Sequence, residues 1–402
     1  MPRRAGGPLR CPTVPPALTD PLSPTFLDAL ARGLGVTRVA RVTGLDRTGV
    51  EVACAVRPGG HVLQVCNGKG LTYEAAARGA LFETAELWAA ETVRPERLRW
   101  GSQAELERAG DTVWGVEALG SAGAVVAPRL AGPAVRLAWC EARTLDGNER
   151  VWVPAQGVYC PPSGTVELGP VSVAWTTNGS GAHPESEPAL LHALLEATER
   201  DQLARALPEG WSEEGVVGRM LRPESLADGA PRTAALAEAL RARGFKAYLF
   251  DVTPALRTRG RVGLPVAAAV LVDVDEGPVP LTAGYACAMD RDEALQKALL
   301  EAAQSRLTDI HGAREDVAAA DREASLGFAQ ALSEVRPRRA VDAMPDALDR
   351  RAKTATAKVR TVLSLLDGAG FKQVAGVALD APVPGLHVWK VVVPGMQVSE
   401  LL

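Results

Sequence analysis

The sequence of 402 residues lacks the features of secreted, zinc-binding and membrane-spanning proteins. Its six cysteines are scattered, with no Cys-x-x-Cys pair and no Cys/His cluster at zinc-binding spacing, so we expect neither a disulfide framework nor a zinc site. No run of about 20 apolar residues is present, and the basic N-terminus lacks the apolar stretch of a signal peptide. We therefore expect a soluble, cytoplasmic protein that does not enter a membrane.

Positive charge is not concentrated in any part of the chain. The formal net charge is -4, and no long run of Lys and Arg occurs. Proteins that bind nucleic acids usually carry a basic patch or stripe, so we expect no nucleic-acid partner.

The common nucleotide-binding and hydrolytic motifs are also missing. The sequence around Lys69 lacks the upstream glycine and the following Ser or Thr of GxxxxGK[ST]. The NGSG stretch at 178–181 runs into Pro184 and is not GxGxxG, although such a turn could bring backbone N–H groups close to a phosphate. None of the five histidines stands beside a Ser or Cys in a nucleophile motif. We therefore expect the nucleophile of any reaction to come from outside the protein or from its substrate.

Helix-like and strand-like segments are interspersed, and strand-like segments often follow one another directly, as do those at 36–44 and 50–58. This order predicts an α+β fold with mixed or antiparallel sheets and packed helices. The VSVAWTTNG stretch at 171–179 is among the predicted strands. Seven prolines in residues 1–25 predict an extended arm, and residues 26–402 are expected to form a single domain. Residues 315–365 are rich in Ala and Arg, and we expect them to form a peripheral helical segment.

Three predicted helices, at 72–92, 187–206 and 292–309, share a pattern that suggests a ligand site. In each, an Ala-Leu lead-in precedes a Glu, and a Glu or Gln follows three residues later. A spacing of i, i+3 places both side chains on one helical face, about one turn apart. The residues of the three pairs are Glu83 and Glu86, Glu196 and Glu199, and Glu301 and Gln304.

Paired carboxylates among Ala and Leu residues predict a bound divalent cation. Like charges at this spacing repel each other, and their burial without a partner is costly. Mg²⁺ prefers oxygen ligands and binds through a few carboxylates together with substrate phosphates, so it would remove both penalties. The alternative is that each pair lies on the solvated face of an ordinary amphipathic helix, since Glu is a good helix former. The threefold occurrence of the pattern favours the metal site.

Together, these stretches resemble the YcaO family of ATP-dependent peptide-modifying enzymes, over about residues 36–396. The carriers of the resemblance are GVTRVARVTGLDRTGVEVACAVRP with NGKGLT, GALFETAELWAAE, NGSG with ALLEATERD, and ALLEAAQSR with GAREDV. The resemblance implies a YcaO-like catalytic domain in which three related Glu-bearing helices surround a Mg-ATP site. It implies that the metal ligands are Glu83, Glu86, Glu196, Glu199 and Glu301. It further implies nucleotide contacts from Asn178, Glu187, Arg200 and Gln304, with Lys69 and Arg314 as additional cofactor-binding residues.

The chain departs from the family pattern at three places. The first motif commonly has Ser at the position of Gly79 and Arg at that of Leu87. The C-terminal VVVPGMQVSELL also differs from the Pro-x-Pro-x-Pro ending that azoline-forming members often carry. The absence of this ending makes the chain similar to the branch resembling thioamide-forming members, which work with a separate TfuA-type protein.

The resemblance implies activation of a peptide backbone amide by phosphorylation, after which a nucleophile replaces the phosphate. A Cys, Ser or Thr side chain as nucleophile gives an azoline, and external sulfide gives a thioamide. The expected partners are a peptide or protein substrate and a TfuA-like protein, and a homodimer is compatible with the sequence. The alternative function is that of a non-catalytic accessory factor for methylthiolation of a ribosomal protein.

Overall fold

The computed structural model describes residues 23–119, 128–314, 321–347 and 353–398. It contains two three-stranded sheets and one six-stranded sheet, in which all pairs of neighbouring strands are antiparallel. The predicted α+β fold is therefore confirmed. Most of the proline-rich arm, residues 1–22, lies outside the described residues.

The first unit of the fold is a three-stranded meander followed by a helix. After α1 (Pro24–Leu34), strands β1 (Arg38–Arg41), β2 (Glu51–Val56) and β3 (Val65–Gly70) pair in chain order. Helix α2 (Tyr73–Glu91) then packs against β3 and β2. The Thr72 side chain accepts a hydrogen bond from the N–H of Ala75, as an N-cap residue does, and so fixes where α2 begins.

The third unit repeats this order. Strands β8 (Phe245–Asp251), β9 (Val266–Asp273) and β10 (Leu281–Cys287) form a meander, and α8 (Arg291–His311) packs against β10 and β9. The sequence analysis did not predict β10.

The second unit is assembled from two distant parts of the chain. Strand β7 (Ser180–His183) leads directly into α4 (Ser186–Ala206), but it pairs with the C-terminal strand β12 (His387–Val392), which in turn pairs with β11 (Ala375–Leu379). The order β11-β12-β7 thus corresponds to β1-β2-β3 and β8-β9-β10.

The same close approach of strand and helix occurs in all three units. A Cβ atom on Gly68 of β3 would collide with the backbone of Ala76 and Ala80 in α2. Gly181 meets α4 in the same way, at Ala189 and Ala193, and Gly284 meets α8 at Ala298 and Ala302. Only glycine allows the strand to lie this close to the helix.

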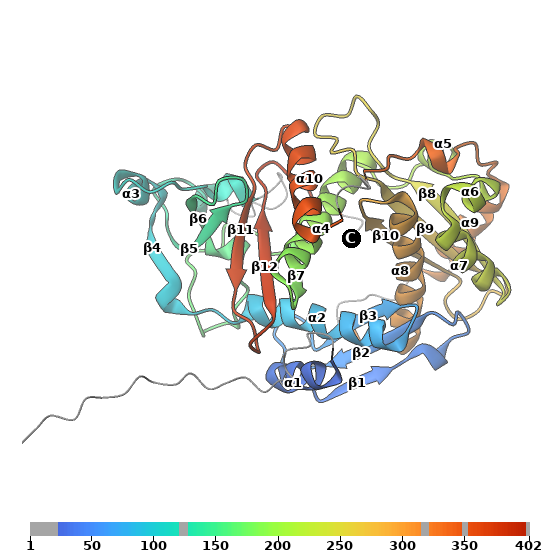
Figure 1. Cartoon of the computed structure of the whole chain (residues 1–402), viewed down its shortest axis with the longest axis horizontal. Coiled ribbons are helices and arrows are strands. Elements are labelled where there is room, and N and C mark those ends of the chain that lie inside the picture. Colours follow the sequence, from blue (N-terminus) through green and yellow to red (C-terminus); the bar gives the residue numbers. More distant parts are fainter. Residues whose placement is uncertain (1–22, 120–127, 315–320, 348–352, 399–402) are drawn as a thin grey trace, which may run out of the picture.

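The three units form a closed ring (Figure 1). Each sheet lies between the helix of its own unit and a helix of another unit: α2 also contacts β7, α4 also contacts β10, and α8 also contacts β3. The hydrophobic core is correspondingly divided into three large clusters, one around each helix, in which successive residues of the middle strands β2, β9 and β12 point into different clusters. The three glutamate-bearing helices therefore surround one centre.

The remaining elements lie outside this ring. In the segment 315–365, α9 (Arg322–Glu334) exposes most of its residues, whereas α10 (Ala355–Gly368) packs on α4 through Val359 and Val362 and belongs to the core. The other elements are β4 (Leu98–Ser102), α3 (Gln103–Arg108), β5 (Arg136–Thr144), β6 (Arg150–Pro154), α5 (Glu213–Arg219), α6 (Leu226–Gly229) and α7 (Pro231–Arg241). No helix within the described ranges is long and apolar enough to cross a membrane.

The strand predicted at 171–179 is wrong. This stretch is an extended loop, and β7 begins only at Ser180. At the start of this stretch the Gln156 carboxamide donates to the O of Pro170 and accepts from the N–H of Ser172, as a neighbouring strand would otherwise do. The alternating apolar residues that suggested a strand instead pack as single side chains, such as Val173 in a small cluster with Trp139.

Candidate functional site

The structure brings the five predicted glutamates together at the centre of the ring. Glu83 and Glu86 come from α2, Glu196 and Glu199 from α4, and Glu301 from α8. They are close enough for electrostatic effects between helices, since Glu196 raises the pKa of Glu86, Glu83 that of Glu196, and Glu301 that of Glu199. The spacing of i, i+3 aims both members of each pair on α2 and α4 inward, as the pattern predicted.

Hydrogen bonds between units hold three of these carboxylates in place. The N–H of Ala182 in β7 donates to Glu86 Oε1 over 2.8 Å. The N–H of Cys287, at the end of β10, donates to Glu199 Oε2 over 2.9 Å. Lys69 Nζ in β3 donates to Glu301 Oε2 over 2.7 Å and so closes the circle. Each unit therefore orients a carboxylate that a different unit supplies.

Three of the glutamates carry an unusually large electrostatic penalty. Burial raises the pKa of Glu86 well above its ordinary value, and the charges of Glu196 and Glu83 add to this effect. Burial also raises the pKa of Glu196 and that of Glu199 to about 7, although the Arg200 guanidinium acts in the opposite direction on both. At neutral pH this group of carboxylates has more negative charge than the protein compensates.

Glu301 is in a different electrostatic state. Burial would raise its pKa, but the ammonium of Lys69, together with Arg200 and the N–H of Tyr285, outweighs burial and holds the pKa below its ordinary value. The two side chains keep 28% and 27% of their surfaces exposed, so a ligand can reach them. The close-approach glycines give the helices a common reference point. Glu301 lies three residues after Ala298, which Gly284 contacts, and so corresponds to Gly79, three residues after Ala76, which Gly68 contacts. Glu301 therefore lies one turn nearer the start of its helix than Glu83 does.

Two further predicted residues lie in the same centre. Arg200 follows Glu199 on α4, and its Nε lies 3.9 Å from Glu199 Oε1 with 26% of the side chain exposed. Asn178 lies in the turn before β7, and its buried Oδ1 has no hydrogen-bond partner among the described residues. A buried polar atom without a partner is rare in folded proteins, and this one is available to accept a hydrogen bond from a ligand or a water molecule.

The structure does not bring all predicted nucleotide contacts into this group. Glu187 is exposed in the first turn of α4, nine residues and about 13 Å along the helix from Glu196. Gln304 is half-buried one turn after Glu301, and Arg314 follows the end of α8 close enough to Cys66 to affect its ionisation. The roles of these three residues stay predictions.

Lys390 belongs to the site, and the sequence analysis missed it. It lies in β12 with 3% of its surface exposed, within electrostatic range of Glu196 and Glu86. Its signal in the sequence was a single Lys inside the strand-like stretch HVWKVVV. A buried Lys is rare unless it is paired, so its place in an apolar strand was the feature to follow.

The donor set fits magnesium and a phosphate-bearing ligand. Carboxylate and carboxamide oxygens are the hard ligands that Mg²⁺ prefers, and the raised pKa values show that positive charge is needed. In the described part of the chain, no three acidic, His or Cys side chains are close enough to hold one ion by themselves. Mg²⁺ commonly takes only one or two carboxylates and completes its shell with water and phosphate oxygens, which suits carboxylates spread around a ring.

Gly79, at a position where the family that the sequence resembles commonly has Ser, provides a gain-of-function test. A Cβ at this position would lie 3.5 Å from the Cα of Gly68, an ordinary contact, so we expect Gly79→Ser to fold. Serine is the better helix former by several tenths of a kcal/mol, so unfolding should require slightly more denaturant. If the hydroxyl reaches the phosphates, Mg-ATP affinity measured by calorimetry should rise about threefold to tenfold. Gly79→Ala is the control, and equal affinities of the two variants would contradict the prediction.

A family model and several known sequences match this chain over most of its length. A family model described as YcaO cyclodehydratase, ATP- and Mg²⁺-binding, matches residues 67–397. A protein from Methanothermobacter thermautotrophicus is 30% identical over 379 residues, which cover 91% of this chain and 90% of the relative. A protein from Rhizobium leguminosarum, described by its position in the tfuA 3' region, is 28% identical over 381 residues, covering 92% of this chain and 85% of the relative.

Solved structures share the fold. YcaO from Methanopyrus kandleri, bound with AMPPCP and Mg²⁺, matches with a TM-score of 0.63 and 23% identity, over 92% of this chain and 88% of that one. A heterocyclase in complex with substrate and cofactor matches with a TM-score of 0.68 and 18% identity, over 92% of this chain and 52% of that one. These likenesses show that the chain has the same fold as these structures.

Proposed function

Because this chain belongs to the YcaO family, we propose that it phosphorylates a backbone amide oxygen of a peptide and so prepares the amide for conversion to a thioamide or an azoline. As a member of this family it is an ATP-dependent peptide-modifying enzyme. The proposal rests above all on one observation. Three helices place five carboxylates around one centre, where burial and mutual repulsion raise the pKa values of Glu86, Glu196 and Glu199.

The residues of the site divide into two roles. Glu83, Glu86, Glu196, Glu199 and Glu301 would hold Mg²⁺. Bound magnesium would neutralise charge on the transferring phosphoryl group. Arg200 offers a guanidinium fork to phosphate oxygens, and Lys69 keeps Glu301 ionised and oriented. The work of the protein is then positioning and charge neutralisation, which suits a reaction in which a poor leaving group becomes a good one.

The nucleophile is proposed to come from the substrate or from outside the chain. Burial raises the pKa of the Cys54 thiol to about 11, and it raises the pKa values of Cys66 and Cys287 as well. Thiols in this state carry almost no thiolate at neutral pH and are poor nucleophiles. A Cys, Ser or Thr of the substrate would give an azoline, and external sulfide would give a thioamide.

Thioamide formation with a TfuA-like partner is the more specific proposal. The Rhizobium relative is described by its position beside tfuA, and the present chain aligns with 85% of that relative. We infer that the chain acts on a ribosomally made peptide or protein, that the partner brings this substrate to the site, and that ATP turnover by the chain alone is slow. The cytoplasmic location and the homodimer stay predictions.

Mass spectrometry on a peptide encoded near the gene tests the proposal, with the chain, a TfuA-like partner, Mg-ATP and sulfide supplied. Exchange of one oxygen for sulfur would support thioamide formation, and loss of one water would move the product to an azoline. Omission of the partner should reduce turnover at least about tenfold, since the partner would supply substrate positioning. If no peptide changes mass while the protein stimulates a methylthiolating enzyme, the proposal fails in favour of the accessory function.

A further inference from the structure

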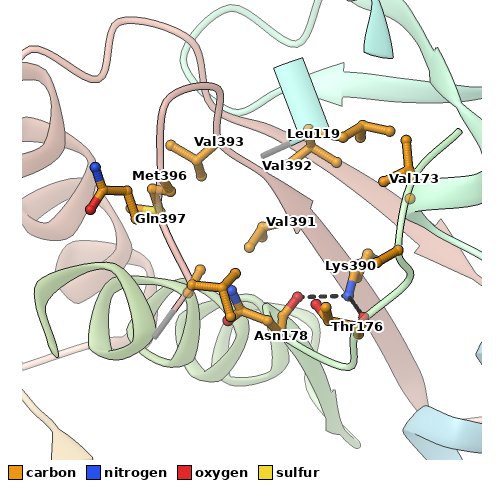
Figure 2. Close-up of a pocket in the computed structure, with 14 residues that line it drawn as sticks. Leu119, Val173, Thr176, Asn178, Lys390, Val391, Val392, Val393, Met396 and Gln397 are labelled. Atoms are coloured by element: carbon orange, nitrogen blue, oxygen red, sulfur yellow. Dashed lines mark hydrogen bonds between the residues drawn. The ribbon is translucent and has the colours of Figure 1, made fainter. Parts of the chain in front are cut away.

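The side chain of Lys390 is held by hydrogen bonds to backbone carbonyl groups, in addition to its attraction to the glutamates. Its Nζ donates to the carbonyl oxygens of Thr176 and Asn178, each over 2.6 Å, as Figure 2 shows. The ammonium also lies 5.7 Å from the centre of the Trp175 ring. The next residue, Val391, donates its N–H to the carbonyl of Gly179, so the backbone of β12 also bonds to the turn directly after the lysine.

The internal repeat shows that the fold does not need a lysine at this position. In each unit, the residue before the close-approach glycine faces one residue of the middle strand. These pairs are Asn67 with Cys54, Ala283 with Val270, and Ser180 with Lys390. Cys54 and Val270 are buried and apolar, and both units have the same strand order and the same helix packing. Lys390 is therefore a departure specific to the second unit, the unit whose turn carries Asn178.

Lys390 lies near two of the predicted metal ligands. Glu86 accepts a hydrogen bond from the N–H of Ala182 in β7, and Lys390 pairs with Ser180 in the same strand. Burial lowers the pKa of Lys390 to about 8, and the carboxylates of Glu196 and Glu86 act against this effect, which shows that they lie within electrostatic range. The turn accepts two hydrogen bonds from the ammonium group, which has three protons to donate.

The turn that Lys390 holds also presents the unsatisfied atom of the site. Gly179 has a left-handed φ of 78°, and a Cβ on it would collide with Val391, so the turn has little freedom to shift. The carbonyl of Asn178 is fixed by the lysine, while its Oδ1 is buried without a partner. Fixing the backbone of Asn178 therefore fixes the place from which its carboxamide can meet a ligand.

We propose that Lys390 is a positioning residue that pins the Asn178 turn for nucleotide binding and limits how strongly Glu86 and Glu196 attract a metal ion before the nucleotide arrives. This inference rests on the proposed function, because it assumes that the centre of the ring binds Mg-ATP. The two effects have opposite signs. Loss of the lysine should loosen the turn and weaken nucleotide binding, but it should also remove a positive charge near two carboxylates and strengthen the binding of a bare divalent cation.

Lys390→Met tests this inference because it removes the charge and the two donors but retains an unbranched apolar side chain. Affinity for a non-hydrolysable ATP analogue with Mg²⁺ is measured by titration calorimetry. Binding of Mn²⁺ alone, as an oxygen-seeking substitute for Mg²⁺, is measured from the spin-resonance signal of the free ion. We expect nucleotide affinity to fall about tenfold and Mn²⁺ affinity without nucleotide to rise about threefold. Lys390→Arg retains the charge and several donors and should restore both affinities to within about threefold of the unaltered protein.

Val388→Ala is the matched control, since Val388 is buried on the same face of the same strand and packs in the cluster around α2. It should lower the melting temperature without separating the two affinities. If Lys390→Met weakens both affinities, or neither, the inference is wrong. Nucleotide binding by the unaltered protein distinguishes failure of the proposed function from failure of this inference alone. If it is absent, the proposed function fails and this inference with it, whereas normal binding that Lys390→Met leaves unchanged overturns only the inference.

Discussion

Replacing Glu196 by Gln is expected to weaken Mg-nucleotide binding by about 100-fold and to make the metal-free protein more stable, because a ligand charge is lost where negative charge is in excess. Glu199→Gln should act in the same way. Burial, together with the neighbouring carboxylates, raises the pKa of each of these residues to about 7, so the ionised forms are unfavourable in the absence of a cation. If the charge of Glu196 stabilised the fold instead, Glu196→Gln would make the metal-free protein less stable.

The pH dependence of stability provides a second readout with a definite sign. Between about pH 4.5 and 7, the folded metal-free protein binds more protons at Glu196 and Glu199 than the unfolded chain does. Its free energy of unfolding should therefore fall as the pH rises through this window. The decline should amount to several kcal/mol, at about 1.4 kcal/mol per unit of pKa shift for each group, and it should become shallower in Glu196→Gln.

Calorimetry with Mg-ATP and chemical unfolding in EDTA measure these effects. Glu238→Gln is the control, since Glu238 lies on the surface of α7 with 62% of its side chain exposed, in an ion pair with Arg241. It should change neither affinity nor the pH profile appreciably. Affinity at the level of the unaltered protein in both Glu196→Gln and Glu199→Gln would show that α4 does not supply metal ligands.

The parts of this site that the sequence could predict are those that depend on local spacing. Three helices with Ala-Leu lead-ins were predicted to within one or two residues of α2, α4 and α8. The spacing of i, i+3 fixes which side chains share a face, so the pairs on α2 and α4 could be assigned to one surface before any fold was known. Helical periodicity is a property of adjacent residues, and for this reason it survives without tertiary information.

The parts that could not be predicted depend on contacts between distant segments. Strands β11 and β12 complete the second unit although almost 200 residues separate them from β7, so the sequence does not show the threefold repeat of strands. Lys390 lies in the site only because of this pairing. The position of Glu301 was also hidden, because its sequence motif matches those of Glu83 and Glu196 while the glycine contact places it one helical turn earlier.

Closure of the ring between its first and third units depends on a buried arginine in the same helix as Glu301. Arg306 has 2% of its surface exposed and donates from Nε to Asp46 Oδ2 and from Nη2 to Asp273 Oδ2, both over 2.8 Å. Asp46 belongs to the connection between β1 and β2, and Asp273 ends β9. The guanidinium also donates to the carbonyl of Val279. One side chain of α8 thus joins segments of both units, far from water.

Arg306→Met is therefore expected to cost about 3–5 kcal/mol of unfolding free energy, because it leaves a buried carboxylate of Asp46 without its partner. Asp273 suffers less, since Arg47 also pairs with it. Arg41→Met is the control, since its pair with Glu51 is on the surface, with 58% of the Arg41 side chain exposed, and its loss should leave the free energy of unfolding nearly unchanged. Denaturant unfolding of both variants measures the difference. Asp46→Asn in the Arg306→Met background should recover part of the loss by removing the uncompensated charge. A cost below about 1 kcal/mol for Arg306→Met would mean that the ring does not depend on this contact.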